Sequence, residues 1–142
     1  MKVGTDGVLL GAWVNCADSK RVLDIGTGTG LISLMIAQRS DAFIDAVEIE
    51  KNACIQANEN FRNSKWSDRI NLFQNDFKEF ATQTDYKYDL IVSNPPFFQN
   101  SLHAPDEQRT NARHNKELEL HEIIEGAEKL LTDDGILSII LP

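Results

Sequence analysis

Three carboxylates and one proline-rich segment are spaced along the chain in a way that suggests chemistry. The carboxylates belong to Asp24, Glu48 and Asp76, and the segment is Asn94-Pro95-Pro96-Phe97. Each of them ends or closely follows a short run of apolar residues of the kind that forms a buried β-strand. Polar groups at the ends of successive strands are well placed to build one shared site.

The segment from Asn94 to Phe97 could prepare an aromatic amine for methylation. The lone pair of such a nitrogen is delocalised into the ring and points poorly at a methyl group. Hydrogen-bond acceptors placed on both N–H groups favour a pyramidal nitrogen. The Asn94 side-chain oxygen and the Pro95 carbonyl could accept these two hydrogen bonds. Proline fixes φ, so the carbonyl is held in place beforehand. We expect Pro96 to stiffen this catalytic segment and Phe97 to stack on the base, which is worth about 1–3 kcal/mol. A rigid turn with a buried phenylalanine is the structural alternative.

A glycine-rich segment follows the first apolar run. Gly26, Gly28 and Gly30 lie between Asp24 and the apolar run that begins at Leu31. Glycines allow a sharp turn and a close approach of ligand to backbone, and the following helix offers free amides. The third glycine comes one residue too early for the dinucleotide fingerprint G-x-G-x-x-G. Asp24 would also be unfavourable beside a pyrophosphate, whereas it suits an ammonium or sulfonium group. A nicotinamide dehydrogenase is therefore the less favoured alternative.

Two further acids could complete a nucleoside site. Glu48 ends the second apolar run, where a carboxylate can accept both ribose hydroxyls. Glu50 falls past the strand end and is less suited. Asp76 could accept a hydrogen bond from an adenine amino group, and Phe77 could pack against the ring. A solvated loop carboxylate at Glu48 and a simple turn at Asp76 are the alternatives.

The elements that must position these residues alternate between strand and helix. Apolar periodicity predicts strands over 21–26, 42–49, 69–74, 89–93 and 136–141, and helices over 8–14, 31–39, 51–63, 77–81 and 117–131. We expect Thr5 or Asp6 to cap the first helix, and a turn at 133–135. The first, fourth and fifth strands are continuous apolar runs, as in a parallel sheet buried on both faces. The pattern predicts a doubly wound α/β domain.

The composition is that of one ordinary domain. The chain has 142 residues, of which 42% are apolar and 25% charged. No apolar run approaches the roughly 20 residues of a membrane span, and the first residues lack a signal-peptide pattern. We therefore expect a cytoplasmic location, no membrane or metal, and a monomer by default. Cys16 and Cys54 are expected to be reduced thiols.

The charge of the chain limits how it could bind nucleic acid. A net charge of −8 and a pI of about 4.8 argue against broad, non-specific binding, which needs clustered basic residues. A local basic patch could still bind nucleic acid. Arg109 and Arg113 are candidates for phosphate contacts that position an RNA loop, and a solvated surface is the equal alternative.

Together these motifs resemble the class I S-adenosylmethionine-dependent methyltransferases. The residues that carry the resemblance are the opening segment from Lys2 to Trp13, the loop from Asp24 to Gly30, Ala46-Val47-Glu48, Asp76 and Asn94 to Phe97. The opening segment is particular to the bacterial tRNA1(Val) adenine-37 N6-methyltransferase family. The resemblance implies a Rossmann-like sheet of order 3-2-1-4-5, S-adenosyl-L-methionine as cofactor, S-adenosyl-L-homocysteine as product and tRNA as substrate. It also implies that Lys2, Thr5 and Asp6 lie near the methionine end of the cofactor, with helix capping as their alternative role.

The resemblance leaves the ends of the domain and the substrate open. The family has a segment before the opening stretch and two more strands after the fifth, so we expect residues 1–142 to be one methyltransferase domain truncated at both ends. Similar motifs serve methylation of guanine N2 in rRNA, of DNA amines and of the glutamine amide of release factors. A non-catalytic cofactor-binding module is the alternative of another class.

Overall fold

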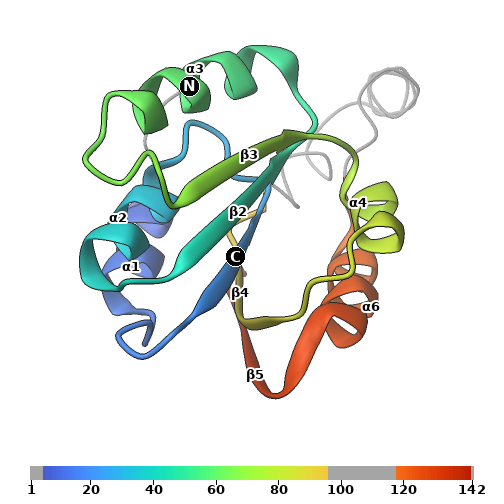
Figure 1. Cartoon of the computed structure of the whole chain (residues 1–142). Helices are drawn as coiled ribbons and strands as arrows, with labels where there is room; N and C mark the ends of the chain where they lie inside the picture. The colour runs from blue at the N-terminus through green and yellow to red at the C-terminus, as the bar shows by residue number, and fades with distance from the viewer. Residues whose placement is uncertain (1–4, 96–117, 142) are drawn as a thin grey trace.

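The computed structural model describes residues 5–95 and 118–141, which form a parallel sheet covered by helices (Figure 1). The sheet has five strands in the order β3-β2-β1-β4-β5. The strands are β1 (Arg21–Ile25), β2 (Phe43–Glu48), β3 (Ile70–Gln74), β4 (Tyr88–Ser93) and β5 (Leu131–Ile139). The helices are α1 (Thr5–Trp13), α2 (Leu31–Arg39), α3 (Lys51–Arg62), α4 (Phe77–Gln83) and α6 (Leu120–Leu130). The strand order and the alternation with helices confirm the predicted Rossmann-like, doubly wound fold.

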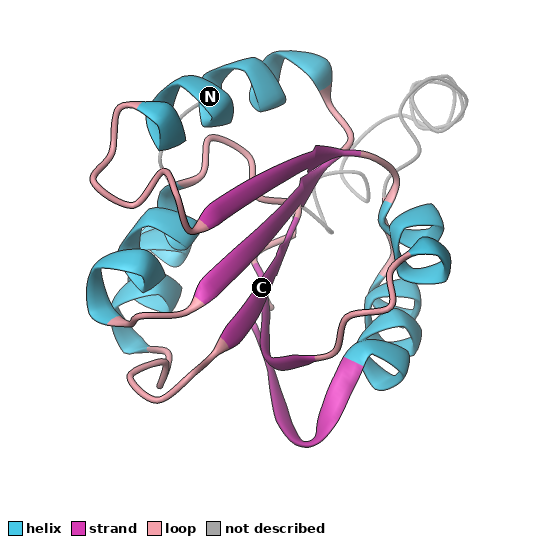
Figure 2. Cartoon of the chain, in the orientation of Figure 1, coloured by secondary structure: helices cyan, strands magenta, loops and turns pink. Residues whose placement is uncertain are grey.

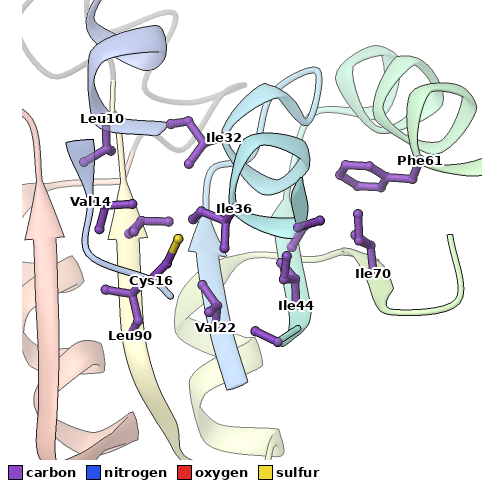
Figure 3. Packing of buried hydrophobic residues seen from close by; sticks show 14 of the residues in the cluster. Leu10, Val14, Cys16, Val22, Ile32, Ile36, Ile44, Phe61, Ile70 and Leu90 are labelled. Carbon is purple, nitrogen blue, oxygen red and sulfur yellow. The ribbon is translucent and has the colours of Figure 1, made fainter. Parts of the chain in front are cut away.

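Helices cover both faces of the sheet (Figure 2). Successive strand residues point to opposite faces, so Val22 and Leu23 of β1 enter two separate hydrophobic clusters. The first cluster joins the sheet to α1, α2 and α3, and Figure 3 shows Ile36, Ile44 and Phe61 within it. The second joins the opposite face to α4 and α6. The sheet is therefore the middle of three layers.

Two helices begin at acidic caps that follow strands. Glu50 precedes α3, and its carboxylate accepts hydrogen bonds from the amides of Asn52 and Ala53. Asp76 precedes α4 and accepts from the Lys78 amide. A carboxylate at this position satisfies amides that lack intrahelical partners and favours the positive end of the helix dipole. These caps fix where the chain turns from strand to helix.

The start of α1 differs from the predicted one. Thr5 is already helical and Asp6 lies in the first turn, so neither residue is the cap that the sequence suggested. Both residue types are favoured before a helix and are also tolerated in its first turn, where an acid still meets the positive end of the dipole. The sequence therefore predicted the region in which α1 lies but not the residue at which the described helix begins.

β5 differs most from its prediction. Pairing passes from Tyr88↔Leu131 to Leu90↔Ile136, so two steps along β4 correspond to five along β5. The predicted turn at 133–135 lies inside this irregular strand, which begins at Leu131 instead of Ile136. The expectation of burial on both faces holds for β1 and β4 and is wrong for β5, since Ile136 is 57% exposed. The reason is topological, because β5 is the edge of the described sheet.

A buried polar network ties the strands together near their amino ends. Asp45 of β2 is 1% exposed and accepts hydrogen bonds from the Tyr88 hydroxyl at 2.6 Å and the Asn71 amide at 3.3 Å. Arg21 pairs with Asp45 at 3.3 Å and lies over the Tyr86 ring. Burial, reinforced by the bond to Asp45, raises the pKa of Tyr88, which keeps its proton and stays a donor. The network joins β1, β2, β3 and β4 at the end of the sheet opposite the glycine loop.

Both thiols are free, as predicted, and the structure shows that both are buried. Burial raises the pKa of Cys16, and it raises the pKa of Cys54 to about 11 with Glu48 and Glu50 adding to the effect. Within 5–95 and 118–141, no helix has both the length and the apolar character that a membrane crossing requires.

Candidate active site

The strand ends bring the predicted site residues to one edge of the sheet. Ile25 at the end of β1 lies between Val47 of β2 and Ser93 of β4. The loop after β1 is therefore flanked by Glu48, which ends β2, and by Asn94, which follows β4. The strands all run in the same direction, so this edge holds all of their carboxyl ends (Figure 2).

The loop after β1 has a backbone that requires glycine. Gly26, Gly28 and Gly30 have φ angles of 70°, 60° and 92°, in the left-handed region that side chains disfavour. The amides of Gly26 and Thr27 both donate to the Val47 carbonyl, at 2.8 and 3.1 Å, which binds the loop to β2. A Cβ on Gly26 would meet no described atom within 4 Å, whereas one on Gly30 would lie 2.4 Å from the Phe61 ring. Gly26 therefore borders open space, and Gly30 is packed against α3.

Asp24 supports this loop from beneath. It is 1% exposed, and its Oδ2 accepts hydrogen bonds from the Thr27 and Ser33 hydroxyls, each at 2.7 Å. Its Oδ1 is buried with no hydrogen-bond partner among the described residues. Burial raises the pKa of Asp24 to about 6, while the two hydroxyl donors act against that rise. Its expected contact with a cationic group stays a prediction, since the geometry assigns it first to the loop.

Several polar residues of the site escaped the sequence analysis. Ser93 donates to the Ile25 carbonyl at 3.0 Å and so joins the ends of β4 and β1. Asn60 of α3 donates to the Thr29 carbonyl at 2.8 Å. Ser33, Thr27 and Ser93 are fully or almost fully buried. The available signal was the presence of a hydroxyl residue within an otherwise apolar run, as at Ser33 and Ser93.

Glu48 turns its carboxylate toward the glycine loop. Its Oε1 accepts from the Gly28 amide at 2.8 Å and its Oε2 from the Glu50 amide at 3.0 Å. Glu50 uses its own carboxylate to cap α3. The Glu48 carboxylate thus lies beside the loop and that of Glu50 caps the helix, while the binding of ribose by Glu48 stays a prediction.

The side chains of Asp76 and Phe77 have different surroundings in the structure. Asp76 is half-buried at the end of β3 and caps α4. Phe77 is 4% exposed, and its ring packs so closely on α6 that a Cβ on Gly126 would lie 2.3 Å from it. The predicted packing of the Phe77 ring on an adenine is corrected accordingly, because the ring belongs to the hydrophobic core. The sequence alone does not indicate whether an aromatic ring that follows a strand faces the site or the hydrophobic core.

Asn94 lies against the first helix. It is half-buried and Pro95 is buried, and a Cβ on Gly7 would lie 3.3 Å from Asn94 Nδ2. The exposed residues Thr5 and Asp6 occupy the same turn of α1, and their position near the methionine end of the cofactor stays a prediction. The candidates outside the described residues are Lys2, Pro96, Phe97, Arg109 and Arg113.

The chemistry of this edge is that of an acceptor-rich site. The Asp24 carboxylate supports the loop and that of Glu48 lies beside it, while Asp76 follows β3 and Asn94 follows β4 at the same edge of the sheet. Such a set suits hydroxyls, amines and positive charge, and it opposes a pyrophosphate group. A nucleoside that carries a cationic group fits these properties.

Comparisons with known proteins identify the family to which the chain belongs. A family model described as a methyltransferase small domain matches residues 4–142. The tRNA1(Val) (adenine(37)-N6)-methyltransferase of Parabacteroides distasonis is 50% identical over 142 residues, covering 100% of this chain and 60% of its own. The protein of that name from Christiangramia forsetii is 53% identical over 146 residues, covering 100% and 61%. The chain therefore spans about three-fifths of the length of these curated relatives.

A solved structure supports the fold. The S-adenosylmethionine-dependent methyltransferase from Geobacter sulfurreducens, in complex with S-adenosyl-L-homocysteine, superposes with a TM-score of 0.69. It is 17% identical and covers 96% of this chain and 48% of its own. At this identity the likeness concerns the arrangement of sheet and helices.

Proposed function

The chain belongs to the methyltransferase small domain family, and from this premise we propose that it transfers a methyl group from S-adenosylmethionine to N6 of adenine 37 in tRNA1(Val). The observation that carries the proposal is the position of Asn94 and Pro95 directly after β4, beside the loop that follows β1. Identity of 50% over the whole chain to relatives named for this reaction supports the choice of substrate. The tRNA substrate also makes the cytoplasm the expected location.

The described residues fit S-adenosylmethionine. The open side of Gly26 leaves room for a ligand against the backbone. Glu48 could accept ribose hydroxyls with the carboxylate that now faces the Gly28 amide, and Asp76 could accept the adenine amino group. Asp24, with its unpartnered buried Oδ1, lends negative charge near the cationic end, where Lys2, Thr5 and Asp6 are also expected. When bound, the cofactor supplies a methyl group activated by a positively charged sulfur.

Asn94 and Pro95 prepare the amine that receives the methyl group. The Asn94 side-chain oxygen and the Pro95 carbonyl accept hydrogen bonds from the two N6–H groups. These bonds direct the nitrogen lone pair toward the methyl group. Fixed dipoles of this kind need little reorganisation as positive charge develops. As the N–CH3 bond forms and the S–CH3 bond breaks, the nitrogen becomes more acidic and releases one proton, so no strong base is required. Pro96 holds the segment rigid, and Phe97 stacks on the base.

RNA binding rests on local charge. Arg109 and Arg113 are the proposed phosphate contacts, and the overall charge of −8 predicts modest, salt-sensitive binding. An adenine turned out of the anticodon loop gives the site the access to N6 that it needs.

Methyl transfer to defined substrates tests the proposal. The chain is incubated with labelled S-adenosylmethionine and unmodified tRNA1(Val), and N6-methyladenosine is identified by mass spectrometry. Asn94→Ala is expected to lower kcat by about 100-fold or more while S-adenosylhomocysteine binding, measured by calorimetry, is retained. Asn63→Ala, at an exposed position that ends α3, is the matched control and is expected to remain active.

Three outcomes would contradict the proposal. Transfer to guanine N2 of rRNA or to release-factor glutamine in place of tRNA would reassign the substrate. Cofactor binding without transfer to any of these would indicate a non-catalytic binding module. Binding of NAD in place of S-adenosylhomocysteine would reject the cofactor.

A further inference from the structure

The helical backbone at Gly7 does not require a glycine. It is a buried residue of α1, and the positive φ angles of the described chain belong to Gly26, Gly28 and Gly30. Glycine in a helix is less stable than alanine by about 0.5–1 kcal/mol. A cause for the glycine must therefore come from what surrounds it.

The neighbour that a side chain at Gly7 would meet is Asn94. Among the described residues, Asn94 Nδ2 is the atom within 4 Å of a Cβ built there, at 3.3 Å. This is shorter than the roughly 3.5–4.0 Å of an ordinary contact, so a methyl group would move the amide by a few tenths of an ångström. Gly11, one turn along α1, differs in kind, because a Cβ there would lie 2.5 Å from Met35 Sδ.

We propose that Gly7 is a positioning residue for the transfer reaction, an inference that rests on the proposed function. Without a side chain at this position, the Asn94 amide rests against α1 with its nitrogen toward the helix. In the proposed function, the Asn94 oxygen on the other branch of the amide accepts a hydrogen bond from the incoming amine, so a shift of the amide would also shift this acceptor. Small displacements of an aligned acceptor weaken catalysis more than binding, because alignment counts most in the transition state.

Gly7→Ala tests this role by separating turnover from binding and stability. We expect kcat on tRNA to fall by about tenfold, with S-adenosylhomocysteine affinity unchanged and Tm equal to or above that of the parent chain. Gly11→Ala is the matched control, because it makes the same change in the same helix where the methyl meets Met35. It is expected to lower Tm and to leave kcat nearly unchanged below the transition.

A spectroscopic measurement reports on the contact itself. The side-chain amide signals of Asn94 in a ¹⁵N-labelled chain are assigned by their loss in Asn94→Asp. They are expected to shift in Gly7→Ala and to stay in place in Gly11→Ala.

The possible failures are distinguishable. A parent chain that methylates no tRNA rejects the proposed function, and the Asn94 signals then still decide whether Gly7 sets the amide. An active parent with a Gly7→Ala variant of equal kcat overturns the positioning role. So does a variant that loses Tm, cofactor binding and turnover together, because Gly7 would then serve the fold alone.

Discussion

At the scale of single residues, Asp24 is an acid that is almost fully buried. Its pKa rises from an ordinary value of 3.8 to about 6, because burial disfavours the charge more than two hydroxyl donors favour it. The folded chain therefore binds this proton more tightly than the unfolded chain does. The protonated carboxyl adds stability below the unfolded pKa, and that stability is lost as pH rises through about 6. The loss amounts to about 3 kcal/mol at most.

Asp24→Asn should remove this pH dependence. Relative to the parent chain, the variant is expected to gain free energy of unfolding as pH rises from about 4 to about 6.5, by up to about 3 kcal/mol. Urea unfolding across this range gives the difference curve, in which contributions from the other acids cancel. Asp18→Asn, which makes the same substitution at an exposed position, is the matched control. A flat curve for Asp24→Asn would show that its carboxyl does not titrate as described.

At the scale of elements, the glycine loop and α3 form one packed unit. Gly30 meets the Phe61 ring, and Asn60 holds the Thr29 carbonyl. The loop therefore owes its shape to its own backbone, to Asp24 beneath it and to the helix beside it. A cofactor loop built this way keeps its conformation before any ligand arrives.

Two glycine substitutions separate backbone strain from packing. Gly26→Ala places a methyl in open space and should cost about 1–2 kcal/mol from its left-handed φ alone. Gly30→Ala adds a collision with the Phe61 ring and should cost about 2–5 kcal/mol. Urea unfolding measures both. Adding Phe61→Leu to Gly30→Ala should recover part of the excess, and equal costs at the two glycines would refute the packing contribution.

The elements that the sequence predicted best are those with the simplest surroundings. The helix expected over 31–39 matches α2, and the first four strands fall within one or two residues of their expected bounds. Apolar runs bounded by glycine or polar residues determine these elements locally. The irregular path of β5 and the direction of the Phe77 ring depend on contacts with β4 and α6, which no local pattern contains. For the same reason the site's carboxylates were predicted, whereas the hydroxyls that support them were not.

At the scale of the whole molecule, β5 is one of the two edge strands of the described sheet. Ile136 is 57% exposed on this strand, and an exposed edge strand offers unpaired backbone groups to other chains. The net charge of −8 opposes association by mutual repulsion between molecules.

Ile136→Lys should slow aggregation of the chain with little change in Tm. Ile55→Lys is a matched control, because Ile55 is also 57% exposed but lies on α3, and both changes alter the net charge equally. Light scattering during incubation at constant temperature is expected to fall more for Ile136→Lys, since a lysine on an edge strand blocks pairing. Equal effects of the two variants would mean that the strand edge is not the site of association.

The buried network around Asp45 has a consequence for how this scaffold can diversify. Its bonds fasten the strands where they begin, through Tyr88, Asn71 and Arg21. The contacts at the far ends, such as Ser93 to the Ile25 carbonyl, are therefore not the sole contacts that hold the strands together. The sequence of the loops at the carboxyl ends could therefore vary while the amino ends of the strands stay aligned by the Asp45 network.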